Sequence, residues 1–341
     1  MLSRPLLVIG GVALDITSTV SPSIKSSVLY TSTPGKITQT LGGVGRNIAE
    51  AAMRTGAKVR LVSVVGDDLA GINVYEGMKL LKMDTRHIQT LKGHNTAVYN
   101  ALHSNTGQLV AAVADMDIFE HMDGVKVSLV ASIIQNEQPN LVCFDGNISS
   151  KVMKEITKTC HAFRIPAFFE PTSVPKALKL FNHHETLQLR SIRYISPNQF
   201  ELDAMSQKIE STPELYKQIK SNKCIHTYGD LSPLAAKTLP QAMHLSHFIP
   251  NVITKLGEEG CLYVGEAGIK YFPPETILPH EIKSVTGAGD CFVGTFIANL
   301  QRHPIDTHLD HIVQKSQLAA IRTLKSDKAV SVDINHDLML N

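Results

Sequence analysis

Short apolar runs alternate with stretches of helical spacing along most of this 341-residue chain. Apolar runs of this kind are typical of strands that are buried on both faces. They lie at 6–9, 59–65, 141–144, 167–169, 194–196, 248–254 and 261–264, and helices are expected near 47–56, 73–82, 150–163, 292–302 and 308–325. Strands that alternate with helices predict an α/β fold, with a mostly parallel sheet covered by helices on both faces.

Two segments depart from that alternation. Residues 96–103 alternate as a strand, Asn105-Thr106-Gly107 predicts a turn, and 108–113 returns as a second strand. A polar, β-rich stretch without helical periodicity also extends to Thr40. We expect one domain over 1–341, in which about 12–40 and 96–115 form a small β-sheet that serves as a lid.

A turn of small residues opens the helix expected near 292. Gly287, Ala288 and Gly289 precede Asp290 and an apolar helical segment. Small residues at a helix N-terminus let unpaired N–H groups approach an anion, and the helix dipole favours a phosphate there. A phosphate at this turn would repel the Asp290 carboxylate. The presence of Asp290 makes sense if it removes a proton from a hydroxyl that attacks the phosphate. The alternative is a structural helix with Asp290 in its first turn, and spacing alone does not separate the two.

A second glycine turn, Gly42 to Gly45, precedes the helix expected near Asn47. Glycine would let a ligand lie against the main chain, and Asn47 offers both a donor and an acceptor. Arg46 faces either a phosphate or a surface carboxylate, and we favour the surface pair. Asp15 follows the first strand, where it either holds a ligand or belongs to a common turn.

Polar and glycine positions recur just after the expected strands. Because the carboxyl ends of parallel strands meet at one edge of a sheet, these positions should share a site. They are Asp15, Gly43 with Asn47, Asp145, Glu170, Asn198 with Glu201, Gly257, and Asp290. The sequence therefore predicts a phosphate-handling α/β enzyme.

Composition narrows the class of protein further. A formal net charge of +2 gives no electrostatic footprint for nucleic acid. The five cysteines are scattered without C-x-x-C spacing, which indicates a reducing compartment rather than a disulfide framework or a zinc site. The N-terminal apolar run is too short for a signal or membrane segment. We expect a cytoplasmic protein that contacts neither nucleic acid nor membrane.

Four motifs in order give the chain a resemblance to the ribokinase/pfkB carbohydrate kinase family, over nearly its whole length. They are Gly42-Gly43-Val44-Gly45-Arg46-Asn47-Ile48-Ala49, Asn198-Gln199-Phe200-Glu201, Thr254 to Gly260, and Thr286-Gly287-Ala288-Gly289-Asp290. Within the family the chain is most similar to pseudouridine kinases. That likeness is carried by Gly43 to Asn47, Val113 to Ile118, Asp145 to Ser149, Phe169 to Ser173 with Lys176, and Ser284 to Gly287.

The resemblance implies a ribokinase-like three-layer sandwich and transfer of the ATP γ-phosphoryl group to the 5′-hydroxyl of pseudouridine. Asp290 would be the base, and N–H groups of Gly287, Ala288, Gly289 and Asp290 would cradle the phosphate. Mg²⁺ would be held by Asn198 and Glu201, mostly through water. The nucleotide would lie against Thr254, Gly257 and Gly260.

The resemblance also implies where the nucleoside binds. Asp15, Gly42, Gly43 and Asn47 would hold the ribose, because a carboxylate accepts two hydrogen bonds from a cis-diol. Thr96, Asp115 and Asn147 are candidates for the base pocket, together with Asp117 and Tyr99. Asp145 and Lys176 are expected nearby, and Glu170 belongs to either the base pocket or the metal network. Ser284 stands where most relatives have an Asp, so one side-chain anion near a bound cation is lost. The resemblance therefore does not decide whether the chain has a ribokinase-type monovalent-cation site.

Several alternatives stand beside a pseudouridine kinase. The chain could be another kinase of the family for ribose, adenosine or a different nucleoside, or a non-catalytic relative that senses sugars or nucleotides. Asp290 disfavours a pure binder, which gains nothing from a carboxylate beside phosphate. A homodimer through the lid and a functional link to a pseudouridine-5′-phosphate glycosidase are further expectations.

Overall fold

A ten-stranded sheet forms the centre of the chain in this computed structural model, which describes residues 4–21, 31–106, 108–124, 127–219, 227–228 and 230–340. Neighbouring strands run parallel except β13, which is antiparallel to both its neighbours. The order across the sheet is β11 (Thr227–Tyr228), β14 (Gly268–Phe272), β13 (Cys261–Gly265), β12 (Asn251–Lys255), β10 (Ile192–Ile195), β9 (Ala167–Glu170), β8 (Leu141–Asp145), β1 (Leu6–Ile9), β4 (Val59–Gly66) and β5 (His87–Leu91).

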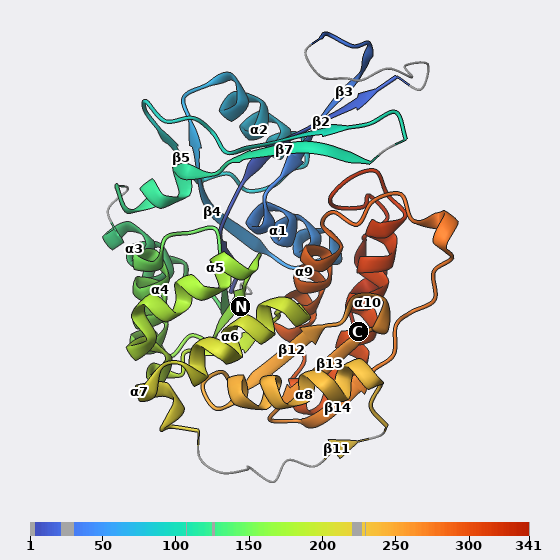
Figure 1. Ribbon diagram of the computed structural model, residues 1–341. Helices are drawn as coiled ribbons and strands as arrows, with labels where there is room; N and C mark the ends of the chain where they lie inside the picture. Colours follow the sequence, from blue (N-terminus) through green and yellow to red (C-terminus); the bar gives the residue numbers. More distant parts are fainter. Residues whose placement is uncertain are drawn as a thin grey trace.

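Helices cover both faces of this sheet, as Figure 1 shows. In β1, Leu6 and Val8 pack into one apolar core while Leu7 and Ile9 pack into the other, so a continuous apolar run is buried on both faces. The first core lies against α1 (Val44–Thr55), α2 (Leu69–Leu80), α9 (Ala288–Leu300) and α10 (Ile305–Leu324). The second lies against α3 (Val127–Glu137), α4 (Ser150–Phe163), α5 (Val174–Leu178), α6 (Gln199–Glu210), α7 (Pro213–Tyr216) and α8 (Pro233–Ser246).

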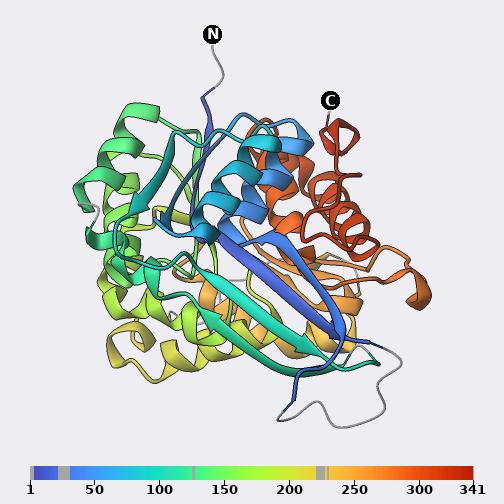
Figure 2. The ribbon, with the colours of Figure 1, turned by 90° about the horizontal axis from the view of Figure 1, so that it is seen from above.

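A separate four-stranded sheet projects from one end of the body (Figures 1 and 2). Its order is β3 (Gly35–Gly42), β2 (Ala13–Val20), β6 (Val98–His103) and β7 (Leu109–Asp115). Leu14 belongs to the core that also contains residues of α2, and the partly buried Ile16, Leu41 and Val98 pack against that core, so one face of this sheet is anchored to the body. The other face carries Asp15, which is paired with Tyr99 across β2 and β6.

The structure confirms the predicted α/β sandwich with a second small sheet, and it shifts several boundaries. Helix α4 covers 150–163 as expected, and β6 and β7 form the predicted antiparallel pair, although Gly107 of its turn lies outside the described residues. Helix α1 begins at Val44 instead of near Asn47, because Asn47 N already bonds Gly43 O at 2.9 Å. That the small sheet closes over a ligand stays a prediction.

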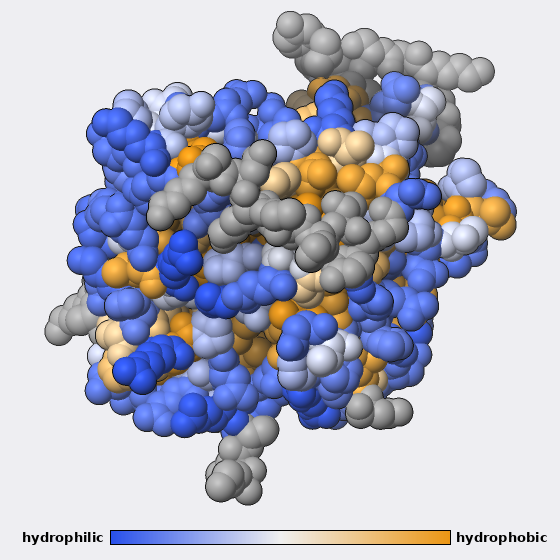
Figure 3. All heavy atoms as spheres, turned by 90° about the horizontal axis from the view of Figure 1, so that it is seen from below, coloured by the Kyte–Doolittle hydropathy of each residue, from blue (hydrophilic) through white to orange (hydrophobic). Residues whose placement is uncertain are grey.

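Short 3-10 helices complete the described chain: η1 (Asp117–Gly124), η2 (Lys179–Leu189), η3 (Gly257–Glu259), η4 (Pro279–Glu281) and η5 (His336–Leu338). On the face seen from below in Figure 3, hydrophilic residues predominate between separate apolar patches. Among the described residues, no helix combines the length and apolarity needed to cross a membrane.

Candidate active site

The loop after β1 brings three elements together at the carboxyl edge of the large sheet. A Cβ at Gly45 would lie 2.7 Å from Gly10 Cα, so only glycine allows α1 to approach this loop so closely. Arg46 N donates to Gly11 O at 3.1 Å, and Gly11 N donates to Asp145 Oδ2 at 2.8 Å. The N-terminus of α1 and the end of β8 are therefore held against the end of β1.

The N-terminus of α9 faces the same edge and has the geometry of an anion site. Gly287 has φ 79°, and a Cβ there would overlap the carbonyl oxygen of Ala329. The first strong intrahelical bond runs from Cys291 N to Gly287 O at 2.8 Å, which leaves the N–H groups of Gly289 and Asp290 at the open end. A helix N-terminus with open donors suits phosphate oxygens, and binding of a phosphate at this turn stays a prediction.

Asp290 lies beside Asn47, a residue 243 positions away in the chain. Asn47 Nδ2 donates to Asp290 Oδ2 at 2.6 Å, which leaves Oδ1 for another partner. Burial raises the pKa of Asp290 from its usual value of 3.8 to about 6, against the lowering effects of the Asn47 hydrogen bond and the Lys255 charge. A carboxylate with this pKa is ionised at neutral pH yet basic enough to accept a proton.

Arg46 orients that asparagine, and the surface pairing that we favoured for it is wrong. Its side chain is 3% exposed and pairs with the buried Glu50, one turn along α1. It also donates to Asn47 Oδ1 and to the carbonyl of Gly42. A guanidinium can only donate, so it binds the amide oxygen of Asn47 and directs the amide nitrogen toward Asp290.

Asp15 lies next to the Gly42 turn, on the face of the small sheet opposite the one that is anchored to the body. A Cβ at Gly42 would overlap the Asp15 carboxylate, so glycine makes room for that side chain. Burial raises the pKa of Asp15, and the charge of Arg46 opposes the shift. Arg46 therefore acts electrostatically on both Asp15 and Asp290.

Two residues expected in the base pocket are placed differently. Asp115 pairs with Val98, which pairs with Leu14, so the register puts Asp115 on the face opposite Asp15. Thr96 is buried and donates to Asp68 Oδ1 at 2.6 Å, while accepting from Gly66 N at 2.8 Å. These bonds give Thr96 a structural role at the base of the small sheet. A contact of Thr96 or Asp115 with substrate stays a prediction.

Asn147 and Lys176 meet next to the β1 loop. Lys176 Nζ donates to Asn147 Oδ1 at 2.5 Å, and Asn147 Nδ2 lies 3.0 Å from the position of a Cβ on Gly11. Asp145 accepts from the backbone N–H groups of both Gly11 and Asn147, at 2.8 and 2.9 Å. Asp145 thus holds the loop, while Asn147 and Lys176 present donor groups beside it.

Asn198 and Glu201 form a capping box at the N-terminus of α6. Asn198 Oδ1 accepts from Phe200 N and Glu201 N, both at 2.9 Å, and Glu201 Oε2 accepts from Asn198 N at 2.8 Å. The other Glu201 oxygen has no hydrogen-bond partner among the described residues. One available carboxylate oxygen fits Mg²⁺, which keeps most of its water and is shared with phosphates. Nowhere in the described chain do three His, Cys, Asp or Glu side chains gather as a metal cluster.

Lys255 and Glu170, at the ends of β12 and β9, form an ion pair beneath α9. Lys255 Nζ lies 2.8 and 2.9 Å from the two Glu170 oxygens. Burial lowers the pKa of Lys255, but the charges of Glu170 and Glu201 outweigh it and hold the pKa above its usual value. The sequence analysis assigned no separate role to Lys255. Lysine is seldom buried without a partner, so a lysine at the end of a buried apolar strand could have indicated a functional or paired residue.

The turn from β12 to β13 contains the other nucleotide candidates. Gly257 and Gly260 both have positive φ, and Leu256 N donates to Gly260 O at 2.9 Å. The Thr254 hydroxyl is buried without a hydrogen-bond partner in the described structure. Side chains alternate along β12, so Thr254 points to the face opposite Lys255. The turn lies at the shared edge, while the Thr254 side chain faces away from α9.

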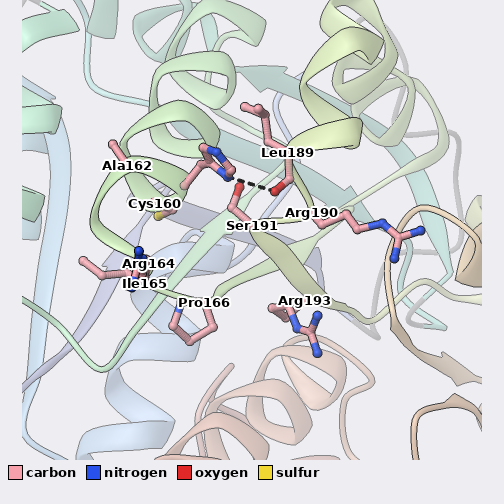
Figure 4. A pocket seen from close by; sticks show the side chains of 10 residues that line it. Cys160, Ala162, Arg164, Ile165, Pro166, Leu189, Arg190, Ser191 and Arg193 are labelled. Carbon is pink, nitrogen blue, oxygen red and sulfur yellow. Dashed lines mark hydrogen bonds between the residues drawn. The ribbon is translucent and has the colours of Figure 1, made fainter.

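An open pocket of about 650 Å³ lies at the other end of the strands (Figure 4). It is lined by residues that precede β9 and β10, including Arg164, Arg190 and Ser191, and by His161, whose Nδ1 lies 3.0 Å from Leu189 O. None of the predicted site residues lines it. The chemistry-bearing groups therefore gather at the carboxyl edge and not in this pocket.

The family model for pfkB family carbohydrate kinases matches residues 6–333. The chain belongs to the pfkB carbohydrate kinase family. Two solved structures of similar fold are a Cryptococcus neoformans ribokinase in complex with ADP and a Burkholderia thailandensis nucleoside kinase in complex with inosine. Their TM-scores are 0.70 and 0.68, their identities 19% and 16%, and the alignments cover 98% of this chain in both cases and 98% and 95% of theirs.

Three curated relatives of this pfkB chain share one nucleoside in their names. A pseudouridine-metabolizing bifunctional protein of Schizosaccharomyces pombe is 29% identical over 97% of this chain and 48% of its own length. Pseudouridine kinases of Escherichia coli and Arabidopsis thaliana are 27% and 24% identical, over 84% and 86% of this chain and 81% and 84% of theirs. The chain thus spans about half of the S. pombe protein.

Proposed function

We propose that this pfkB chain transfers the γ-phosphoryl group of ATP to the 5′-hydroxyl of pseudouridine. The observation that carries the reaction type is the Asn47–Asp290 contact at the open N-terminus of α9, where a base and an anion cradle adjoin. Family membership and the pseudouridine kinases among the relatives support the substrate. The nearest alternative is another nucleoside or sugar as acceptor.

In the proposed reaction the substrate oxygen forms a bond to the γ-phosphorus, and the bond from that phosphorus to the β,γ-bridging oxygen breaks. The bridging electron pair leaves with ADP, and the hydroxyl proton passes to Asp290 Oδ1. Backbone N–H groups of Gly289 and Asp290 bind the phosphoryl oxygens as charge develops. Asn198 and Glu201 would hold Mg²⁺, mostly through water, and the ion would supply further charge neutralisation.

Recognition of the nucleoside is divided between two sides of the site. Asp15, Gly43 and Asn47 hold the ribose, with the Asp15 carboxylate accepting from its hydroxyls. Asn147 and Lys176 present N–H donors, which match the carbonyl oxygens of a uracil ring.

The small sheet closes over the nucleoside and pairs two chains as a homodimer. A glycosidase acting on pseudouridine 5′-phosphate is the expected consumer of the product.

The test is ATP-dependent phosphorylation of pseudouridine, uridine, adenosine and ribose with Mg²⁺, with products identified by mass spectrometry and phosphorus NMR. We expect phosphorylation at the 5′-oxygen and the highest kcat/KM with pseudouridine. Preference for ribose or adenosine would keep the reaction and refute the substrate. No phosphorylation of any acceptor would refute the proposed reaction itself.

Gly42→Ala is expected to weaken nucleoside binding through Asp15. The new Cβ overlaps the Asp15 carboxylate, so the carboxylate must move. Losing a hydrogen bond to a charged group should raise the KM for the nucleoside by about 10- to 100-fold, with a smaller change in kcat. Steady-state kinetics of Gly42→Ala, Asp15→Ala and the double variant check this. If the two effects add instead of overlapping, Gly42 acts independently of Asp15.

The pH dependence of kcat/KM should reveal the Asp290 carboxyl group. Its pKa is raised to about 6, and the base must be ionised, so kcat/KM should fall about tenfold per pH unit below that value. The Asn47 hydrogen bond lowers this pKa, so Asn47→Ala should move the acid limb to higher pH. A limb near pH 4, or one unmoved in Asn47→Ala, would contradict this assignment.

A further inference from the structure

The Lys255–Glu170 pair spans two strand ends beneath the first turn of α9. Strand β10 lies between β12 and β9, so the lysine reaches across a neighbouring strand to bind both oxygens of Glu170. The exposed fractions of the two side chains are 18% and 4%. The bidentate contact and this burial fix the ammonium group in one place.

That place is next to the anion-binding turn. A Cβ added to Gly289 would have Lys255 Nζ as its nearest neighbour, at 3.6 Å. The charge of Lys255 also lowers the pKa of Asp290, so the ammonium acts on the base as well. Lys255 therefore lies beside both the N–H cradle and the carboxylate that the proposed reaction uses.

The ammonium of Lys255 and the N-terminus of α9 are both positive, and the neighbouring carboxylates offset that repulsion. An anion bound between the ammonium and the helix N-terminus would be attracted by both. Burying an ion pair also carries a desolvation cost that the attraction repays only in part. A phosphoryl group at the turn would reverse the repulsion, and it could accept the ammonium N–H that Glu170 leaves over.

We propose that Lys255 is a catalytic residue that stabilises negative charge on the transferring phosphoryl group, and that Glu170 is its positioning residue. The inference rests on the proposed phosphoryl transfer and extends its anion cradle from backbone N–H groups to a side chain. The ammonium stays protonated throughout. It binds an oxygen of the γ-phosphoryl group while the bonds to phosphorus form and break, and Asp290 alone takes the hydroxyl proton.

The decisive experiment compares Lys255→Met, Glu170→Gln and the double variant. Lys255→Met should lower kcat by about 10²- to 10³-fold with little change in nucleoside KM. Glu170→Gln should lower kcat by roughly 10- to 100-fold, because the ammonium is retained but misplaced. Each single variant should also have a lowered Tm, since it leaves one buried group without its partner.

The double variant separates a catalytic lysine from a structural pair. With both charges removed, no uncompensated buried charge remains and the Tm should recover. We expect kcat to stay as low as in Lys255→Met. Recovery of kcat together with the Tm would show that the pair only supports the fold, and would overturn the proposal.

Binding of a non-hydrolysable ATP analogue tests Lys255 independently of the acceptor nucleoside. Lys255→Met should weaken the β,γ-methylene analogue by about 10- to 100-fold while changing ADP affinity much less, because only the triphosphate reaches the turn. Equal losses for both nucleotides, or none, would refute the proposal. This readout keeps its meaning if pseudouridine is not the substrate.

A matched control is the ion pair between Lys270 and Asp310, which has a similar geometry in an exposed setting. Lys270 Nζ lies 2.8 and 3.1 Å from the two Asp310 oxygens, and neither residue is assigned to the site. Lys270→Met should leave kcat and the affinity for the triphosphate analogue unchanged. An equal loss of kcat and analogue affinity in Lys270→Met would show that removing any lysine charge has this effect, and would contradict a specific role for Lys255.

Discussion

Asp290→Asn is expected to lower kcat by about 10²- to 10⁴-fold, with nucleoside KM nearly unchanged. The amide oxygen of the new side chain can still accept from Asn47 Nδ2, so the contact that positions residue 290 is retained. The amide cannot take a proton from the attacking hydroxyl. Steady-state kinetics with the preferred acceptor measure the loss, and near-normal turnover would exclude Asp290 as the base.

The same substitution should stabilise the protein at neutral pH. The pKa of Asp290 is raised from 3.8 to about 6, so its contribution to stability is full below pH 3.8 and is lost as the pH rises through 6. Asp290→Asn avoids that loss, which amounts to about 2 to 3 kcal/mol above pH 6. Urea unfolding between pH 5 and 8 should show the variant's advantage growing up to about pH 6. An Asn variant less stable than the parent at pH 8 would contradict this reading.

Gly287→Ala is expected to have the second large effect, on stability as well as turnover. At φ 79° an alanine is strained, and its Cβ would overlap the Ala329 carbonyl oxygen and lie 2.7 Å from its carbon. Backbone strain and overpacking together should cost roughly 2 to 5 kcal/mol. Displacing the turn should also lower kcat by about 10²- to 10³-fold, because its N–H donors move.

Gly289→Ala is the matched control for that stability effect. It changes a glycine two positions further along the same turn, but the nearest atom to its new Cβ is 3.6 Å away. Its free energy of unfolding should match the parent's or exceed it by up to about 1 kcal/mol, since alanine favours a helix more than glycine does. Equal destabilisation of both variants would show that the Ala329 contact is not the cause.

The glycine and apolar patterns predicted much of the fold because they act locally. A buried strand requires a continuous apolar run, and a close turn requires glycine, whatever the rest of the chain does. The strand from Leu6 to Ile9 and the turn at Gly287 can therefore be predicted from the sequence alone. The recurrence of polar residues after strands likewise predicted that Asp145, Glu170 and Asp290 would share an edge, because parallel topology brings those ends together.

Partners and faces were decided only by the tertiary structure. Lys255 binds Glu170 across 85 positions and Asn47 binds Asp290 across 243, and no local pattern encodes such distances. Arg46 looked like a surface residue because its spacing does not show that α1 packs against the β1 loop. The sequence by itself determined the α/β sandwich, the glycine turn that precedes α9 and the strand ends at which polar residues recur. Packing and strand register decided which of those residues touch, since a side chain's partners depend on which elements meet.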